Sequence, residues 1–413
     1  MKLIAKIGIG IGVGVVAIAA VGTATVYGLW HNELNSMFSI KKVVDAHPDN
    51  KAGAVYEMTM DGGFYFDDFL KKGGASNDGD LIDFIVSNLT KGLFEVHLDQ
   101  PEIGCSSFTC LDENGNNLFG RNYDFASTNS LILHTNPGNG RHATISSVDL
   151  QFLSLVDGIN SLMDKATAIA AAYAPLDGMN DAGVSCGIYM SYQGPGDVSI
   201  STDQNTDKPD LTSTTMLRLI LDYADDVDEA IDLVKQYDFH DSANSSFHYM
   251  VADKSGKSAI LEWVADGVTD STDTDGSNRM LRVYYNDADS ALGEKEAANN
   301  FQYITNFIVT PGYYDGEPID SMKGKDRYDY IPATINPDGN NPEGKFSKEG
   351  ALGLLQDLGR RDWNAQVGSD SNNITVWSSL YDLDNLEVTW VSNEEFDAVS
   401  YTHLRAHETG RNL

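Results

Sequence analysis

The feature that most restricts this chain lies at its N-terminus, where Ile7–Trp30 form a run of 24 residues without a charged side chain. About 20 apolar residues are enough to span a bilayer as a helix, whereas a signal peptide has a shorter apolar region of roughly 7–15 residues. The six glycines of this run would weaken a helix in water, but membrane helices tolerate glycine. We therefore expect residues 1–30 to be a transmembrane anchor, with a cleaved signal segment as the alternative.

Two lysines, Lys2 and Lys6, precede the apolar run and set its expected orientation. Positive charges stay on the cytoplasmic side of a membrane, so the remainder of the chain is expected outside it. The predicted location is the cell membrane, with the main domain extracellular, or secreted if the first segment is removed. Contact with the membrane is expected through this helix only, and a homo-oligomer is left open.

The charge balance excludes one class of partner. The chain has 61 acidic and 28 basic residues, which gives a formal net charge of −33. Binding of phosphate backbones draws on clustered Lys and Arg, so no nucleic acid partner is expected. An acidic surface of this kind favours solubility and repels polyanions.

Three cysteines, Cys105, Cys110 and Cys186, are too few for a disulfide framework or a four-cysteine zinc site. We interpret Cys110 as a core residue or as a partner of Cys186. No cluster of His, Cys and carboxylate residues has the spacing of metal ligands, so no metal and no cofactor is predicted.

Hairpin and helix patterns alternate along the chain and predict an α+β fold. Three pairs of strand-like runs flank turn sequences rich in Asp, Asn and Gly. These pairs are Cys105–Leu111 with Leu118–Phe125, Phe247–Ala252 with Ser258–Val264, and Ile374–Leu380 with Leu386–Val391. Apolar spacing predicts helices over Leu81–Leu93, Thr214–Tyr223 and Val227–Gln236, and over parts of Val148–Ala172.

Changes in texture divide the chain into four segments. Residues 1–30 form the anchor or signal segment, and residues 31–104 form a pre-segment. Residues 105–398 form the expected catalytic domain. Residues 399–413 gather His403, Arg405, His407 and Arg411 in an otherwise acidic protein. Their order resembles translated adapter read-through, so this tail is interpreted as a sequencing artefact, with a real basic tail as the alternative.

The candidate nucleophile is Cys105, because its surroundings are unusual for a buried cysteine. Gly104 precedes it and leaves the carbonyl of the Gly–Cys bond sterically open to the thiol. Arg121 follows sixteen positions after the cysteine and Asp124 nineteen positions after it. A hairpin that turns at residues 112–117 brings both side chains back toward Cys105, where a charged residue is costly to bury unless it is paired.

This arrangement resembles the linear amide C–N hydrolases of the choloylglycine hydrolase family, which belong to the N-terminal-nucleophile superfamily. The segment from Gly-Cys-Ser-Ser-Phe-Thr to Phe-Gly-Arg-Asn-Tyr-Asp-Phe carries the most specific match. Further matches lie at Asp177–Val184, His248–Glu262, Thr305–Asn306, Asp326–Tyr328 and Thr375–Tyr381. The long pre-segment is similar to that of the penicillin-synthesis acyltransferase and of acid ceramidase-like amidases, which cut themselves at the cysteine.

The resemblance implies a role for each matched residue. Autocleavage between Gly104 and Cys105 would make Cys105 the first residue of the mature chain. Its thiolate would attack the amide carbonyl, and its own α-amine would be the general base. Asp124 would orient that amine, and Arg121 would lower the pKa of the thiol.

Three further residues complete the implied catalytic set. Asn180, through its backbone N–H, and the side chain of Asn306 would form the oxyanion hole, and Arg327 would complete the charge network. Alternatives remain for each of these residues: Asn180 as a turn residue, Asn306 as a local cap and Arg327 as a surface residue. Arg121 and Asp124 could instead form a structural ion pair with each other.

The implied fold is a four-layer αββα sandwich of two antiparallel sheets flanked by helices. The implied activity is hydrolysis of a linear amide, with a conjugated bile salt, penicillin V or an N-acyl amide as the small-molecule substrate. The alternatives are an acyltransferase that uses the same acyl-enzyme and a non-catalytic surface binding protein. The 31–104 pre-segment would remain as a subunit after self-cleavage.

Overall fold

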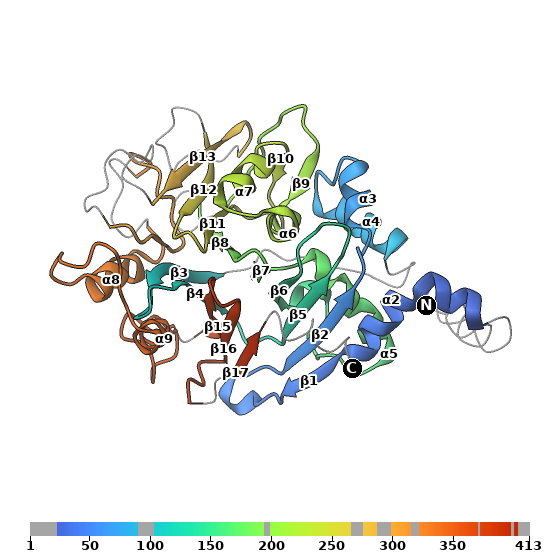
Figure 1. Cartoon of the computed structure of the whole chain (residues 1–413), viewed down its shortest axis with the longest axis horizontal. Helices are drawn as coiled ribbons and strands as arrows, with labels where there is room; N and C mark the ends of the chain where they lie inside the picture. The colour runs from blue at the N-terminus through green and yellow to red at the C-terminus, as the bar shows by residue number, and fades with distance from the viewer. Residues whose placement is uncertain are drawn as a thin grey trace.

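The computed structural model describes residues 23–89, 103–193, 199–265, 276–286, 299–314, 322–370, 372–397 and 400–403. The chain is α+β, as predicted, with two large sheets between layers of helices. Figure 1 shows the N-terminal strands in blue beside the green β5 and β6, and the orange helices α8 and α9 at the opposite side of the molecule.

The larger sheet has nine strands in the order β1-β2-β5-β6-β7-β8-β11-β12-β13. Their bounds are β1 Lys41–Val44, β2 Val55–Asp61, β5 Ser130–Asn136, β6 Thr144–Asp149, β7 Asp177–Asn180, β8 Val184–Met190, β11 Phe247–Asp253, β12 Ser258–Ala265 and β13 Arg279–Tyr285. All neighbouring strands are antiparallel except β2 and β5, which run parallel. The predicted purely antiparallel sheet is therefore wrong at this pair, because β2 comes from the pre-segment and is not joined to β5 by a hairpin.

The smaller sheet has six strands in the order β14-β3-β4-β15-β16-β17, and all of its pairs are antiparallel. Their bounds are β3 Gly104–Leu111, β4 Asn117–Phe125, β14 Tyr303–Ile304, β15 Ile374–Asp382, β16 Glu387–Ser392 and β17 Ser400–His403. The three predicted hairpins are confirmed as β3–β4, β11–β12 and β15–β16.

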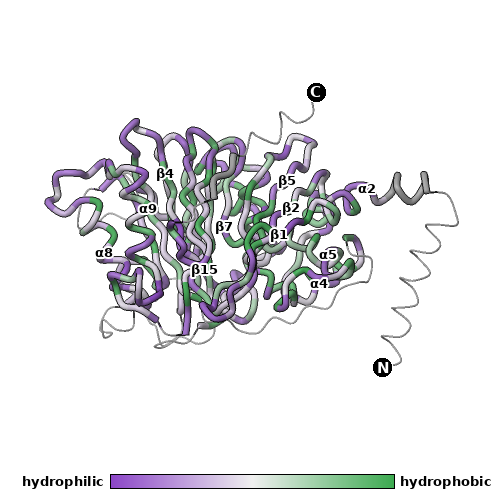
Figure 2. The backbone as a smooth tube through the Cα atoms, turned by 90° about the horizontal axis from the view of Figure 1, so that it is seen from below, coloured by the Kyte–Doolittle hydropathy of each residue, from purple (hydrophilic) through white to green (hydrophobic). Residues whose placement is uncertain are grey.

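Helices cover both sheets on their outer faces, and Figure 2 shows α8 and α9 on one side of the sheets and α4 and α5 on the other. The helix bounds are α2 Thr23–Ser39, α3 Phe66–Lys71, α4 Asp78–Asn88, α5 Leu162–Ala168, α6 Ser213–Tyr223, α7 Val227–Val234, α8 Lys325–Ile335 and α9 Lys348–Asp357. Short 3-10 helices span Pro48–Asn50, Leu150–Leu153 and Ile169–Tyr173. A small parallel pair joins β9, Asp210–Thr212, to β10, Asp238–His240.

One helix prediction is wrong in its extent. The span Val148–Ala172 contains the end of β6, a 3-10 turn and only one α-helix, the seven-residue α5. Ser161 caps that helix together with Asp164, so it begins after the middle of the predicted span. Asn129 accepts and donates across the preceding loop, and Asp149 accepts from Gln151, which ends the strand in a tight turn.

The alternation of side chains along β4 creates two separate cores. Phe119, Arg121 and Tyr123 face the space between the two sheets, and Phe119 and Tyr123 join the main core there. Leu118 faces the opposite side, where it packs in a second core with residues of α8 and α9 such as Ile331. Successive strand residues point to opposite faces, so position parity along β4 decides which core a residue enters.

The two ends of the chain lie partly outside the described residues. Most of the predicted anchor, residues 1–22, is not described, and Thr23–Trp30 form the start of α2. Within the described ranges, no helix combines the length and the apolar character needed to cross a membrane. At the other end, the backbone of β17 pairs with β16 up to His403, and residues 404–413 of the doubtful tail lie beyond the described part.

Candidate active site

Cys105 lies near the start of β3 with its side chain between the two sheets, and it is fully buried. Its strand is inner to the six-stranded sheet, with β4 on one side and the short β14 on the other. β14 pairs with β3 only at Phe108 and Ser107. Cys105 therefore lies beyond the end of that ladder, where no strand neighbour takes its backbone groups.

Two side chains take the place of the missing strand. The backbone N–H of Cys105 donates to Asn306 Oδ1 at 2.8 Å, and Arg327 Nη1 donates to the Cys105 carbonyl oxygen. Arg327 Nη2 also donates to Asn306 Oδ1 at 2.8 Å. Asn306 and Arg327 thus act together on the backbone of Cys105, from two segments that lie about 200 residues further along the chain.

The sulfur of Cys105 has a separate partner. Arg121 Nη2 lies 3.5 Å from Cys105 Sγ, and Arg121 Nε donates to Asp177 Oδ2 at 2.9 Å. Trp377 Nε1 donates to the same carboxylate at 2.8 Å, and the Tyr381 hydroxyl donates to its other oxygen. This buried carboxylate balances the Arg121 charge and fixes the direction in which the guanidinium points.

Asp124 lies on the opposite face of β4 from Arg121, because the two are three positions apart. It accepts from Arg327 Nη1 at 3.2 Å and from the Thr375 hydroxyl at 2.7 Å. The alternative of an Arg121–Asp124 ion pair is therefore wrong. Asp124 is directly opposite Gly104 in the ladder, and a Cβ at Gly104 would lie 2.9 Å from Asp124 Oδ2. Any side chain at position 104 would meet this carboxylate.

The pKa of the thiol depends on two opposing effects. Burial raises the pKa of the Cys105 thiol to about 11, and the Arg121 and Arg327 guanidinium groups offset only part of that rise. Arg121 thus acts in the predicted direction, but in the uncut chain desolvation outweighs it. The thiol is neutral at physiological pH in this form of the protein.

A second pair of buried residues holds the loop that carries Asn306. His248 Nδ1 lies 2.9 Å from Glu262 Oε1, and His248 Nε2 lies 3.0 Å from the Thr305 carbonyl oxygen. Glu262 also accepts from the backbone N–H groups of Val309 and Thr310. The matched segment His248–Glu262 therefore positions the Thr305–Asn306 pair.

Asn180 is not brought to this centre by any of its described hydrogen bonds. Its amide donates to the carbonyls of Leu221 and Ala224 at the end of α6, at 3.1 and 2.8 Å. Its Oδ1 accepts from the N–H groups of Ala182 and Val184. Asn180 lies three positions after Asp177 and so faces the helix side of the sheet, in agreement with the alternative of a turn residue.

Asn306 also differs in orientation from the predicted oxyanion donor. Its Nδ2 donates to the Met190 carbonyl oxygen at 2.9 Å, while its oxygen faces Cys105. In the uncut chain the side chain holds the nucleophile's nitrogen.

Three residues of the centre carried no predicted role: Asp177, Tyr189 and Thr375. Asp177 heads the matched Asp-Gly-Met-Asn block, and Thr375 heads the matched late strand, so both motifs were visible in the sequence. Tyr189 lies under Arg121, with the guanidinium carbon 4.4 Å from the ring centre, and its hydroxyl donates to Ser107. No local pattern pointed to Tyr189, because only packing of β8 against β3 brings it there.

All three cysteines are free and buried. The alternative of a Cys110–Cys186 pair is therefore wrong, since the two lie on different sheets. Cys110 packs in the second core, beside α8 and α9, as the core interpretation predicted.

The site as a whole has the form of a thiol centre, in which a buried cysteine meets two guanidinium groups and two carboxylates between packed sheets. Residues 105–272 match the model of the linear amide C-N hydrolases, choloylglycine hydrolase family. The predicted resemblance to this family of amide hydrolases is thereby confirmed over that stretch, which begins at Cys105.

Comparison with solved structures finds three similar enzymes. A mutant of the conjugated bile acid hydrolase from Clostridium perfringens is 16% identical, with a TM-score of 0.45, over 72% of this chain and 92% of that one. Penicillin V acylase from Agrobacterium tumefaciens is 15% identical, with a TM-score of 0.41, over 70% and 83%. The Caenorhabditis elegans ortholog of N-acylethanolamine-hydrolyzing acid amidase is 13% identical, with a TM-score of 0.36, over 68% and 93%. A search of curated sequences finds no match.

Proposed function

We propose that this protein cuts itself between Gly104 and Cys105 and then hydrolyses linear amides with Cys105 as its nucleophile. One observation carries the proposal: each polar atom of Cys105 has its own partner. Asn306 takes the nitrogen, Arg327 the carbonyl oxygen and Arg121 the sulfur. A cysteine that served only as core filling would not require three polar side chains.

The self-cleavage step follows from the position of the thiol next to its own peptide bond. The sulfur attacks the Gly104 carbonyl carbon, the C–N bond to Cys105 breaks, and the thiol proton passes to the departing nitrogen, giving a thioester. Water then hydrolyses the thioester to a Gly104 carboxylate and a free Cys105 thiol. Asp124 is the carboxylate beside this bond, so it is assigned to orient the nitrogen that becomes an amine.

Cleavage changes the chemistry of the same nitrogen from an amide to a base. An α-amine has a pKa of about 7.7–8.0, close to the value that proton transfer near neutral pH requires. Asn306 Oδ1 and Asp124 would hold this amine above the thiol. The amine takes the thiol proton as the sulfur attacks a substrate carbonyl, and it returns the proton to the leaving amine. The fold fits this proposal as a member of the N-terminal-nucleophile type, with the two sheets as its inner layers.

An apolar cavity of about 80 Å³ supports an apolar acyl group in the substrate. It lies beside Ile103, two residues before the nucleophile, and α4 of the pre-segment covers it with Leu81, Ile82 and Ile85. The opposite wall includes Ile188 and Leu176. In the uncut chain Ile103 lies in this wall, so an acyl chain would enter after the new end at Gly104 has moved. Penicillin V, N-acyl amides and conjugated bile salts remain the candidate substrates.

The sheet pairing supports retention of the pre-segment after cleavage. β2 pairs with β5 along its whole length, and β1 pairs with β2 at the edge of the same sheet. Buried side chains such as Met58 and Phe69 add apolar contacts that would be lost on separation.

The test is the intact mass and the N-terminal sequence of the purified full-length protein. We expect a fragment that begins with Cys105 and copurifies with the pre-segment, together with hydrolysis of N-acyl amides. Cys105→Ala should remain one chain and lose at least about a thousandfold in activity, whereas Cys110→Ala should behave like the original protein. An unbroken chain that hydrolyses amides would contradict the proposal, and product formation with an added amine would indicate acyl transfer.

A further inference from the structure

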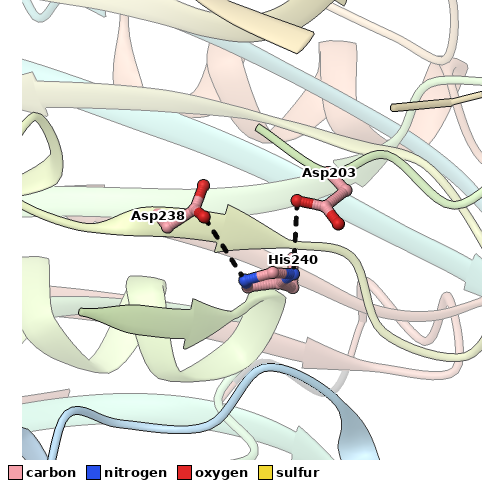
Figure 3. A group of neighbouring side chains, drawn as sticks. All are labelled: Asp203, Asp238 and His240. Atoms are coloured by element: carbon pink, nitrogen blue, oxygen red, sulfur yellow. Dashed lines mark ion pairs between the residues drawn. The ribbon is translucent and has the colours of Figure 1, made fainter. Parts of the chain in front are cut away.

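A group of acidic side chains surrounds one histidine at the small parallel pair β9–β10, away from the Cys105 centre. Asp203, Asp238 and His240 each offer one ligand atom, and these atoms lie within 4.8 Å of one another. Figure 3 shows the two carboxylates on either side of the His240 ring, with an ion pair to each. We refer to these three residues as the β10 cluster.

Local strand geometry explains why two of its members meet. Asp238 and His240 are two positions apart in β10, so their side chains point to the same face of the strand. Asp210 is the ladder partner of Asp238 in β9, and its Oδ1 lies 3.1 Å from His240 Nε2. Asp203 reaches His240 from the preceding loop, where the two residues form an isolated bridge, with Asp203 Oδ1 3.5 Å from Nδ1.

The charges of this arrangement do not balance. Asp203, Asp210 and Asp238 carry three negative charges, and His240 carries at most one positive charge. Even with a protonated ring, these four side chains sum to −2. The neighbouring carboxylates Asp203 and Asp210, together with burial, raise the pKa of Asp238. This repulsion distinguishes the cluster from an ordinary His–Asp pair.

Asp238 provides a second, independent observation. Its side chain is about 98% buried and faces His240, with Oδ2 3.8 Å from Nε2. Oδ2 also accepts from the Thr206 N–H, but Oδ1 has no hydrogen-bond partner although it is buried. A buried carboxylate oxygen without a partner costs free energy unless another group, such as a bound cation, neutralises it.

We propose that the β10 cluster is a binding site for one divalent transition-metal ion, of the Zn²⁺ or Mn²⁺ kind. A carboxylate oxygen from Asp203, one from Asp238 and one ring nitrogen of His240 are the ligands. A mixed imidazole and carboxylate set suits these ions better than Ca²⁺ or Mg²⁺, which prefer oxygen ligands alone. Asp210 holds the ring, in the manner of the carboxylates that orient metal-binding histidines.

The ion would act as a cross-link between separate parts of the chain. It joins the 199–206 loop to β10, and through Asp210 it borders the pre-segment, because the Ala75 N–H donates to the Asp210 carbonyl and the Asp210 N–H donates to the Gly73 carbonyl. The site takes no part in the chemistry at Cys105 and does not depend on the proposed function.

The test measures binding of Zn²⁺ and Mn²⁺ to the purified, chelator-treated full-length protein by equilibrium dialysis with elemental analysis. We expect one tightly bound ion per chain and a melting temperature that rises by a few degrees on adding that ion. Asp203→Asn and His240→Gln should each weaken binding at least tenfold and remove the rise in melting temperature. Asp203 is half-exposed, so its variant should fold even if the His240 variant does not.

Asp207→Asn is the matched control, because it removes a charge from the same loop at an exposed position outside the cluster. It should bind the ion like the original protein. Binding that is absent, or that is equally strong in Asp203→Asn, would overturn the proposal. Preference for Ca²⁺ with no loss in His240→Gln would also overturn it, since the histidine would then not be a ligand.

Discussion

The molecule contains two polar centres that differ in how their charges are balanced. At the Cys105 centre, Arg121 faces Asp177 and Arg327 faces Asp124, so each buried cation has its carboxylate. At the β10 cluster, three carboxylates surround one imidazole. The first centre is complete as a protein network, whereas the second gains from an additional cation. The difference indicates that buried charge around Cys105 serves geometry, and that charge around His240 serves binding.

The largest effect is expected from breaking the balance of the first centre. Asp177→Ala leaves the Arg121 guanidinium buried without its carboxylate, because the two side chains are 1% and 0% exposed. We expect a loss of about 3–5 kcal/mol in the free energy of unfolding. Urea unfolding in a Cys105→Ala background measures it without interference from cleavage. Asp157→Ala, at an exposed position, is the control, and a loss no larger than in that control would show that the balance is unimportant.

A somewhat smaller effect is expected at Asn306, where two variants separate two roles. Asn306→Ala removes both amide atoms and should slow self-cleavage and hydrolysis by about 10²–10³, the typical effect of losing one well-placed hydrogen-bonding group at an active site. Asn306→Asp keeps the oxygen that accepts from Cys105 but loses the N–H groups. If the oxygen positions the nucleophile, the Asp variant should retain much more activity than the Ala variant in a time course of cleavage. Equal loss in both variants would favour the predicted oxyanion role instead.

The thiol pKa provides a third test of the first centre. A pKa of about 11 means that the thiolate fraction of Cys105 in the uncut chain rises about tenfold for each pH unit between 7 and 10. Labelling with iodoacetamide should rise with pH accordingly, and the cut form should already react near neutral pH. Mass spectrometry distinguishes the two forms in one sample. A flat pH profile for the uncut chain would contradict the effect of burial.

The smallest effect is expected from a charge removed at the second centre. Without divalent cations, Asp203→Asn should change the free energy of unfolding by less than about 0.5 kcal/mol, and toward stabilisation, because it relieves repulsion among like charges. Asn can still accept from the Asn205 N–H at 2.7 Å. With Zn²⁺ added, the original protein should become the more stable of the two. A marked loss without cations would mean that Asp203 has a structural role, and would remove the contrast between the two centres.

Some of the site was visible in the sequence because it is carried by motifs of fixed spacing. The β3–β4 hairpin could be predicted from its turn, and with it the return of Arg121 toward Cys105. Asn306 and Arg327 were identified through short family motifs, and the structure brings both to the backbone of Cys105. The parallel pairing of β2 with β5 was not predictable, because it joins segments that no turn connects.

The sequence alone determined the local strands, the turns and the residues that alternate along them, because these depend on neighbours within a few positions. The tertiary structure decided which cation met which carboxylate. Arg121 pairs with Asp177 instead of Asp124, since packing of one sheet on the other sets the contacts across the interface. It likewise turned Asn180 toward α6 and gathered Asp203, Asp238 and His240 at one edge, because both depend on chain segments that only the folded sheet brings together.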